Sequence, residues 1–173
     1  MKNIATRNGF MGALVVVLFY TMIYFVKKEL LLNPWVQWGP MVFYAAFMYK
    51  AQQEDCALYG AERDFRAMVR IPFITFILIN LGYWLWYYAS HLADPSLITQ
   101  EIQVMLSDLE QQLSAGTGDP QQANDIRMQI AEHKKVIAAP TMPLLPVVTR
   151  MAFGSIGGFL LAALLTAIKR MNN

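Results

Sequence analysis

The sequence predicts an all-α polytopic membrane protein with four transmembrane helices and an extracytoplasmic helical hairpin between the third and the fourth. The first observation is that four windows lack Asp, Glu, Lys and Arg, although 15% of the 173 residues are charged: residues 8–26, 30–49, 71–93 and 151–168. Each window approaches the roughly 20 apolar residues that a helix needs to cross a hydrocarbon core of about 30 Å. The second is that the long polar segment after the third window carries two amphipathic patterns. A soluble domain, a disordered chain and a disulfide scaffold are excluded.

Residues 1–89 are expected to hold the first three spans. Gly9–Val26 is interpreted as a retained first span, because it lacks a small-residue cleavage pattern before its basic flank. The short connection that follows predicts a tight antiparallel turn into the second span, Leu30–Tyr49. Two prolines and a glycine between Asn33 and Pro40 indicate a turn and a kink at its start. Ile71–Ala89 is the third span, with a proline in its expected first turn.

The positions of Lys and Arg predict that both termini are cytoplasmic. With the N-terminus inside, eight basic residues lie close to the spans on the cytoplasmic side: Lys2, Arg7, Lys50, Arg63, Arg66, Arg70, Lys169 and Arg170. Three lie close to the spans on the opposite side: Lys27, Lys28 and Arg150. The aromatic residues at the outer ends of the second and third spans agree with this orientation, because Trp and Tyr favour the headgroup level.

Residues 50–70 form an inner amphipathic connection, the first part of which is expected to continue the second span as a helix. Arg63, Arg66 and Arg70 fall at helical spacing and would share one face. Such a face suits anionic lipid headgroups. These arginines serve either as ordinary anchors on the positive side of the membrane or as a dedicated lipid-headgroup site.

Residues 90–146 are expected to form the extracytoplasmic hairpin and a proline-rich strap. Asp94-Pro95 and Asp119-Pro120 each combine a capping carboxylate with a proline suited to a first helical position. An apolar seam with heptad-like spacing follows each pair. The first seam is Ile98, Ile102, Met105, Leu109 and Leu113, and the second is Ala123, Ile126, Ile130, His133 and Ile137. Prolines at every third position, Pro140, Pro143 and Pro146, predict an extended strap after the hairpin.

Residues 147–173 hold the fourth span, Met151–Ile168, and a short basic tail. Gly154 and Gly158 form a GxxxG pattern, which lets helix backbones approach closely. The expected partner is a small patch on the first span, and a second copy of the chain is the alternative. In the third span, the amide of Asn80 is expected to hydrogen-bond to another helix.

No residue pattern points to catalysis, a metal or a cofactor. The predicted spans contain no charged side chain, which argues against proton relays and intramembrane active sites. The two histidines, His91 and His133, have no further ligand pair at zinc spacing. A lone cysteine, Cys56, cannot form a disulfide within the chain, and the small basic excess does not favour nucleic acid.

The order of these parts carries a family resemblance. A basic start leads into a glycine-containing span (2–12), followed by an immediate aromatic return (35–49), a Phe-to-Pro approach to the third span (65–72) and a glycine-rich last span that ends in Ile168, Lys169 and Arg170. This order resembles a family of small four-span bacterial inner-membrane proteins known as a domain of unknown function. The resemblance implies a multi-pass location in the bacterial inner (cytoplasmic) membrane and supplies no activity or site residues.

The leading functional hypothesis is a non-enzymatic assembly or accessory subunit that acts through its outer hairpin. Its expected partners are membrane lipids and either further copies of the chain or a larger membrane complex. The alternative is a protein that binds or translocates lipid through the arginine face of the inner connection. A small-solute transporter and an envelope enzyme are less favoured, because no cluster of acid, base and nucleophile is present.

Overall fold

The computed structural model describes residues 2–60, 64–116, 120–138 and 140–171, which are almost entirely helical and contain no strand. The all-α fold class is therefore confirmed for the described residues. The chain divides into two compact units. The first unit is Met1–Tyr87 together with Leu144–Asn173, and the second is Tyr88–Pro143.

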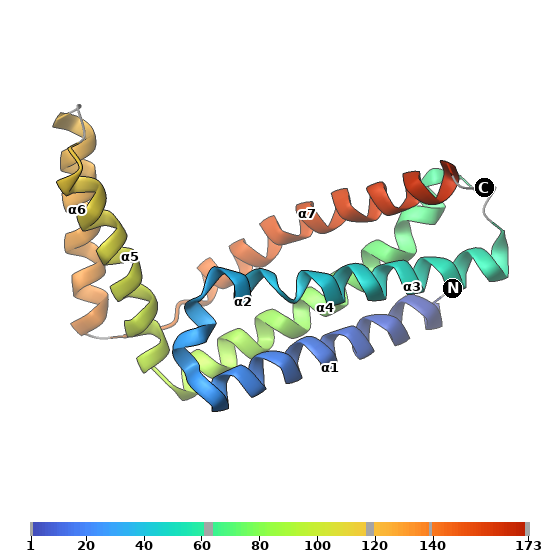
Figure 1. Cartoon of the computed structure of the whole chain (residues 1–173), viewed down its shortest axis with the longest axis horizontal. Coiled ribbons are helices and arrows are strands. Elements are labelled where there is room, and N and C mark those ends of the chain that lie inside the picture. The colour runs from blue at the N-terminus through green and yellow to red at the C-terminus, as the bar shows by residue number, and fades with distance from the viewer. Residues whose placement is uncertain (1, 61–63, 117–119, 139, 172–173) are drawn as a thin grey trace. The chain divides into compact units, whose positions relative to one another are not determined.

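Four long helices make up most of the first unit and lie alongside one another (Figure 1). They are α1 (Lys2–Lys27), α3 (Met41–Tyr59), α4 (Phe65–Ala93, whose last turns belong to the second unit) and α7 (Leu144–Met171). α1 and α4 run in one direction and α3 and α7 in the other, so that the start of α1 and the end of α7 lie at the same end of the unit (Figure 1).

Three helical segments are long and apolar enough to cross a membrane: Asn3–Leu32, Phe65–Ala93 and Leu144–Met171. Large apolar side chains on their outer surfaces remain exposed, including Leu14, Phe25 and Phe153. A surface of this kind would be costly in water and is what lipid tails contact in a helical membrane protein. The protein is therefore described as membrane-associated.

The second charge-free window forms a broken helix. The 3₁₀ helix η1 (Lys28–Leu32) makes the turn after α1, and the short helix α2 (Pro34–Trp38) follows it. The Asn33 side chain accepts a hydrogen bond from the Trp35 amide at 2.9 Å and so caps α2. Gly39 and Pro40 then separate α2 from α3. The kink expected at the start of this window is present, but no single helix covers residues 30–49.

Two helix boundaries differ from the sequence prediction. α4 begins at Phe65, so Pro72 lies in the interior of the helix and not in its first turn. The proline is tolerated there because a missing N–H costs one hydrogen bond in an otherwise long helix that is held by its neighbours. α7 begins at Leu144, so Pro146 belongs to the first turn of α7 and the non-helical strap is shorter than expected.

α4 lies at the centre of the packing of the first unit, because glycines let two neighbours approach it closely. A Cβ atom added to Gly9 of α1 would lie 2.7 Å from Leu78 of α4, and one added to Gly158 of α7 would overlap the ring of Phe76. The expectation that the Gly154 and Gly158 pattern faces the first span is therefore wrong. Both glycine patches face α4, which lies between α1 and α7.

The second unit contains α5 (Ser96–Ser114) and α6 (Pro120–Ala138), which pack against each other. The two helices run in opposite directions (Figure 1). Asp94 accepts hydrogen bonds from the amide of Ser96 at 3.1 Å and from its hydroxyl at 2.6 Å, so its carboxylate caps α5. α6 begins at Pro120, as the sequence predicts, whereas Asp119 lies outside the described residues.

The apolar seam of the second unit follows most of the predicted positions. Ile98 and Ile102 are buried in its core, and Ile126 is buried on α6. Met105, in contrast, is 37% exposed, and Leu106 is buried at 8% exposure. The predicted seam is therefore wrong at this position. Steps of three and of four residues both fit a helix with 3.6 residues per turn, and the packing buries the residue four positions after Ile102. The remaining predicted seam residues are partly buried: Leu109, Leu113, Ala123, Ile130, His133 and Ile137.

Candidate functional site

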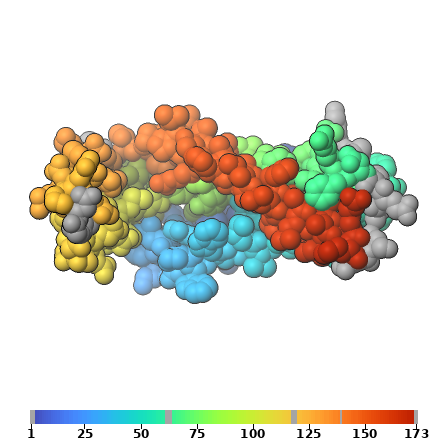
Figure 2. Space-filling view, turned by 90° about the horizontal axis from the view of Figure 1, so that it is seen from above, coloured from blue at the N-terminus to red at the C-terminus, as the bar shows by residue number. Residues whose placement is uncertain are grey.

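A cavity of about 500 Å³ lies in the first unit between the α2–α3 segment, α4 and α7. Figure 2 shows the hollow between α7, in orange, and α2, in light blue. Tyr20 of α1 also contributes to its wall. The volume lies within the range of about 300 to 1,000 Å³ that is usual for small-molecule pockets.

The local sequence explains why a space remains between these helices. Gly154, Gly157 and Gly158 give α7 a surface without side chains. A Cβ atom added to Gly157 would meet no heavy atom within 4 Å, so no neighbouring residue occupies the space beside this part of α7. On the opposite side, the break at Gly39 and Pro40 turns α2 away from the axis of α3.

At the other end of the first unit, polar contacts hold the helices together. The Gln52 amide of α3 donates to the Thr166 hydroxyl of α7 at 2.8 Å, and both side chains are fully buried. Arg7 of α1 forms an ion pair of 2.6 Å with Glu54 of α3. The buried amide of Asn8 donates to the same carboxylate at 2.9 Å. These contacts close one end of the unit, whereas the cavity occupies the part where α3 and α7 have no such polar contact among the described residues.

Half of the residues that line the cavity are aromatic. The rings of Tyr20 and Tyr83 have centroids 5.0 Å apart, and those of Tyr44 and Phe76 lie 5.2 Å apart. Trp84 contacts Tyr83 with an edge-to-face geometry at 5.0 Å. Such ring pairs contribute beyond their buried area, so this wall is expected to be rigid.

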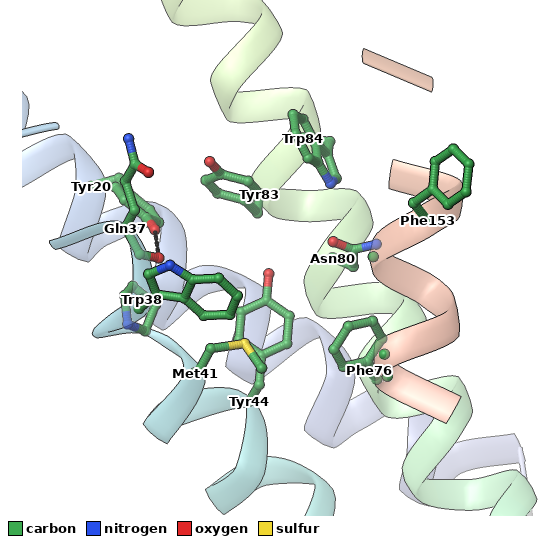
Figure 3. A pocket seen from close by; sticks show the side chains of 14 residues that line it. Tyr20, Gln37, Trp38, Met41, Tyr44, Phe76, Asn80, Tyr83, Trp84 and Phe153 are labelled. Carbon is green, nitrogen blue, oxygen red and sulfur yellow. Dashed lines mark hydrogen bonds between the residues drawn. The ribbon is translucent and has the colours of Figure 1, made fainter. Parts of the chain in front are cut away.

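Some polar atoms of the wall have partners within the protein. The Tyr20 hydroxyl donates to the Gln37 carbonyl oxygen at 3.0 Å (Figure 3). The Asn80 amide nitrogen donates to the Met151 carbonyl oxygen of α7 at 3.2 Å. Asn80 therefore bonds to another helix, which is the role that the sequence suggests for it. Its amide oxygen is turned toward the cavity side (Figure 3).

Two hydrogen-bond donors of less exposed lining residues differ from these; a third lining donor, the Trp38 indole N–H, belongs to a side chain that is 70% exposed. The Tyr44 hydroxyl points into the space between Tyr83 and Asn80, and the Trp84 indole nitrogen lies on the side of its ring that faces Asn80 (Figure 3). Among the described residues, neither donor has an acceptor. By contrast, the indole nitrogen of Trp86, which does not line the cavity, donates to the Thr21 hydroxyl at 2.9 Å.

The lining is suited to binding and not to acid–base or nucleophilic chemistry. The described lining residues include no Asp, Glu, Lys, Arg, His or Cys. Polar groups are limited to tyrosine hydroxyls, indole N–H groups and amides, which orient a ligand and do not transfer protons at neutral pH. Within the described ranges, no group of three His, Cys, Asp or Glu residues could hold a metal ion.

The other residues singled out in the sequence lie elsewhere. Arg66 and Arg70 are exposed on the first turns of α4, and Arg63 lies outside the described residues. His133 is half-buried on α6. His91 is 3% exposed, and its Nε2 lies 3.2 Å from Glu101 Oε1 within the second unit.

Sequence reasoning missed Tyr44, Trp84 and Gly157 as parts of one site. The aromatic residues of these windows have the composition of an interfacial belt, so their pattern alone does not separate a pocket wall from a membrane anchor. One signal was present. A Gly-Pro break in the second window and a cluster of glycines in the fourth are the features that leave space between two helices.

Comparison with known proteins adds no relative. No family model matches the chain, and no curated protein or solved structure matches it. The fold and the site therefore define the class by themselves: a helical protein with three helices able to cross a membrane and an aromatic pocket among its helices. The resemblance to four-span inner-membrane proteins stays a prediction.

Proposed function

We propose that this protein crosses a bacterial inner membrane four times and binds a lipid-like amphiphile from the bilayer in the aromatic pocket. The second crossing is the broken α2–α3 segment. The directions of the helices support a crossing by this segment. Because α1 and α4 run the same way, the chain between them must return along the bundle (Figure 1). The distribution of Lys and Arg supports cytoplasmic termini, with the pocket in the outer half of the membrane.

The observation that carries this function is a cavity of about 500 Å³ with exposed aromatic side chains at its rim. Trp38 and Phe153 contribute to the lining and are 70% and 69% exposed, so in a bilayer they contact acyl chains. An apolar molecule can enter such a site from the side without passing through water. Because lipid tails are as apolar as the wall, shape and polar contacts must select the ligand.

Filling the pocket tests this function. Gly157→Phe places a ring in the open space beside the cavity, where an added Cβ meets no neighbour. Leu160→Phe is the matched control, because Leu160 is 62% exposed on the same helix and does not line the cavity. Native mass spectrometry of protein extracted with native lipids should show a retained apolar molecule in the wild type and the control.

In the Gly157→Phe variant, occupancy should fall at least tenfold. Equal retention by all three proteins would show that the molecule binds elsewhere. Complete absence of a retained molecule from the wild type, in detergents that preserve lipid contacts, would also contradict the proposed function.

A second candidate function is assembly through the α5–α6 pair, which the compactness of the second unit favours. Residues 88–143 form a unit with its own buried core of Ile98, Ile102 and Leu106. A self-contained polar module in a membrane protein is suited to contact another envelope protein. If so, a variant without residues 94–139 should no longer form an oligomer or a complex with a partner on a native gel. A complex of unchanged composition would contradict this role.

A further inference from the structure

The unpaired donors of the pocket indicate which polar group the ligand carries. Tyr44 lies on α3 and Trp84 on α4, and both line the same cavity. No described residue accepts a hydrogen bond from either. In the hydrocarbon region water is scarce, so an unpaired hydroxyl or indole N–H is costly. A ligand with acceptor oxygens would pair both groups.

Comparison with neighbouring residues strengthens this point. Tyr20 and Trp86 carry the same two donor groups and lie in the same bundle, and each has an acceptor within the protein, at 3.0 Å and 2.9 Å. The fold therefore satisfies such donors where it can. Tyr44 and Trp84, which have no such acceptor in the described chain, both line the cavity.

The lining does not favour the headgroup of the commonest membrane amphiphile. A phospholipid headgroup carries a phosphate, which proteins usually pair with Arg or Lys. The described lining has neither residue. Its walls are instead aromatic, with Phe76 and Tyr83 on α4 and Tyr44 on α3. Flat rings pack well against a flat ring in offset or edge-to-face geometry.

We infer that the ligand belongs to the class of prenylated quinones: a flat ring with carbonyl oxygens and an apolar tail. This inference rests on the proposed function of the pocket. The ring occupies the aromatic cavity, and its carbonyl oxygens accept hydrogen bonds from Tyr44 and Trp84. The tail leaves between α2 and α7, where Trp38 and Phe153 face the lipid.

Binding of decylubiquinone to the full chain in lipid nanodiscs tests the inference, with isothermal titration calorimetry as the measurement. Decylbenzene, which has a ring and a tail but no carbonyl oxygen, is the matched ligand. The quinone should bind at one saturable site, at least tenfold more tightly than decylbenzene. Tyr44→Phe and Trp84→Phe each remove one donor and keep a ring. Each should weaken quinone binding about fivefold to tenfold, the worth of one buried hydrogen bond, and leave decylbenzene binding unchanged.

Trp86→Phe is the control for the loss of an indole, because Trp86 lies outside the lining and its donor already has a partner. Its quinone affinity should equal that of the wild type. Equal affinity for the two ligands, or unchanged quinone affinity in both donor variants, overturns the quinone class while the pocket remains a lipid site. If neither ligand binds and Gly157→Phe also leaves the co-purified lipid unchanged, the proposed function itself fails. Unchanged decylbenzene binding reports that a variant is folded.

Discussion

Replacing Gly158 by alanine tests the contact on which the pocket depends, the packing of α7 against α4. A Cβ atom at this position would overlap Cδ1 and Cε1 of Phe76 and would lie 2.5 Å from Cγ of the same ring. The neighbouring Gly157 is the matched control, because a Cβ there meets no heavy atom within 4 Å. The two positions are adjacent on the same helix and undergo the same change in composition, but Gly158 is buried and Gly157 is exposed.

The magnitude follows from this comparison. Substitution of alanine for glycine inside a helix stabilises it by about 1 kcal/mol, and this gain is common to both variants. Overpacking against a ring that cannot move freely costs about 1–3 kcal/mol, and this cost applies to Gly158→Ala alone. Phe76 is 4% exposed and also contacts Tyr44, so its ring is restrained on that side, whereas the cavity that it lines leaves it room to move on another. Gly158→Ala should therefore be less stable than Gly157→Ala by about 1–3 kcal/mol.

Unfolding by SDS in mixed micelles, followed by tryptophan fluorescence, measures this difference. Phe76→Ala removes the ring, so the cost of Gly158→Ala should fall close to zero in that background. Equal free energies of unfolding for the two alanine variants would refute the close approach of α7 to α4. A cost that persists unchanged without the Phe76 ring would place the origin of the effect elsewhere.

Three further predictions follow from individual contacts. Ile102→Ala should destabilise the second unit by about 2–5 kcal/mol, whereas Met105→Ala should cost less than about 1 kcal/mol. Thermal melting of the full chain in detergent measures both changes, and equal effects would contradict the burial of Ile102 and the exposure of Met105. Asn80→Leu should cost about 1 kcal/mol in the SDS titration through loss of its bond to α7, and a stabilised variant would show that this bond is not formed. In a double-mutant cycle, Gln52→Leu and Thr166→Val should couple by about 0.5–1.5 kcal/mol, and additive effects would contradict their direct contact.

Much of the helical order is readable from the sequence, because strong local signals coincide there. The charge-free windows locate α1, α4 and α7, since few charged residues can be placed among lipid tails. The start of α6 at Pro120 is also predictable, because proline suits a first helical position. The boundaries that sequence reasoning misses are those where a helix extends past its apolar part, as at Phe65 and Leu144. Hydropathy reports the membrane region, whereas the backbone hydrogen bonds continue as long as no residue stops them.

Packing partners are harder to predict than helices. The glycines of α7 indicate a close approach, but the sequence does not state which helix approaches. Phe76 fills that role through its position on α4, and nothing in its local pattern distinguishes it from the neighbouring apolar residues. The step from Met105 to Leu106 has a similar origin. Spacings of three and four are both helical, and three-dimensional packing decides between them.

The candidate site is hard to predict for the same reason as the packing partners of the helices. Tyr44 and Trp84 come from helices that no short motif connects, so their shared cavity is a product of the fold. What the sequence does show is that the two surfaces facing each other across the space are unusual, with Gly39 and Pro40 on one side and a glycine cluster on the other. A Gly-Pro interruption in one span together with a cluster of glycines in another is therefore the sequence pattern that indicates such a pocket.

The polar contacts at one end of the bundle and the cavity further along it involve the same two helices, α3 and α7. Gln52 and Thr166 fix the distance between α3 and α7 at one point, with 2.8 Å between their polar atoms. Away from that point, the separation of the two helices depends on their crossing angle, which determines the width of the pocket. Because a buried polar group that loses its partner is costly, we expect this contact to stay closed when the two helices change their crossing angle. A ligand that bonds to Tyr44 on α3 and packs against α7 would then stabilise one crossing angle. Loss of the hydrogen bond between Gln52 and Thr166 should consequently weaken ligand binding, even though neither residue lines the cavity.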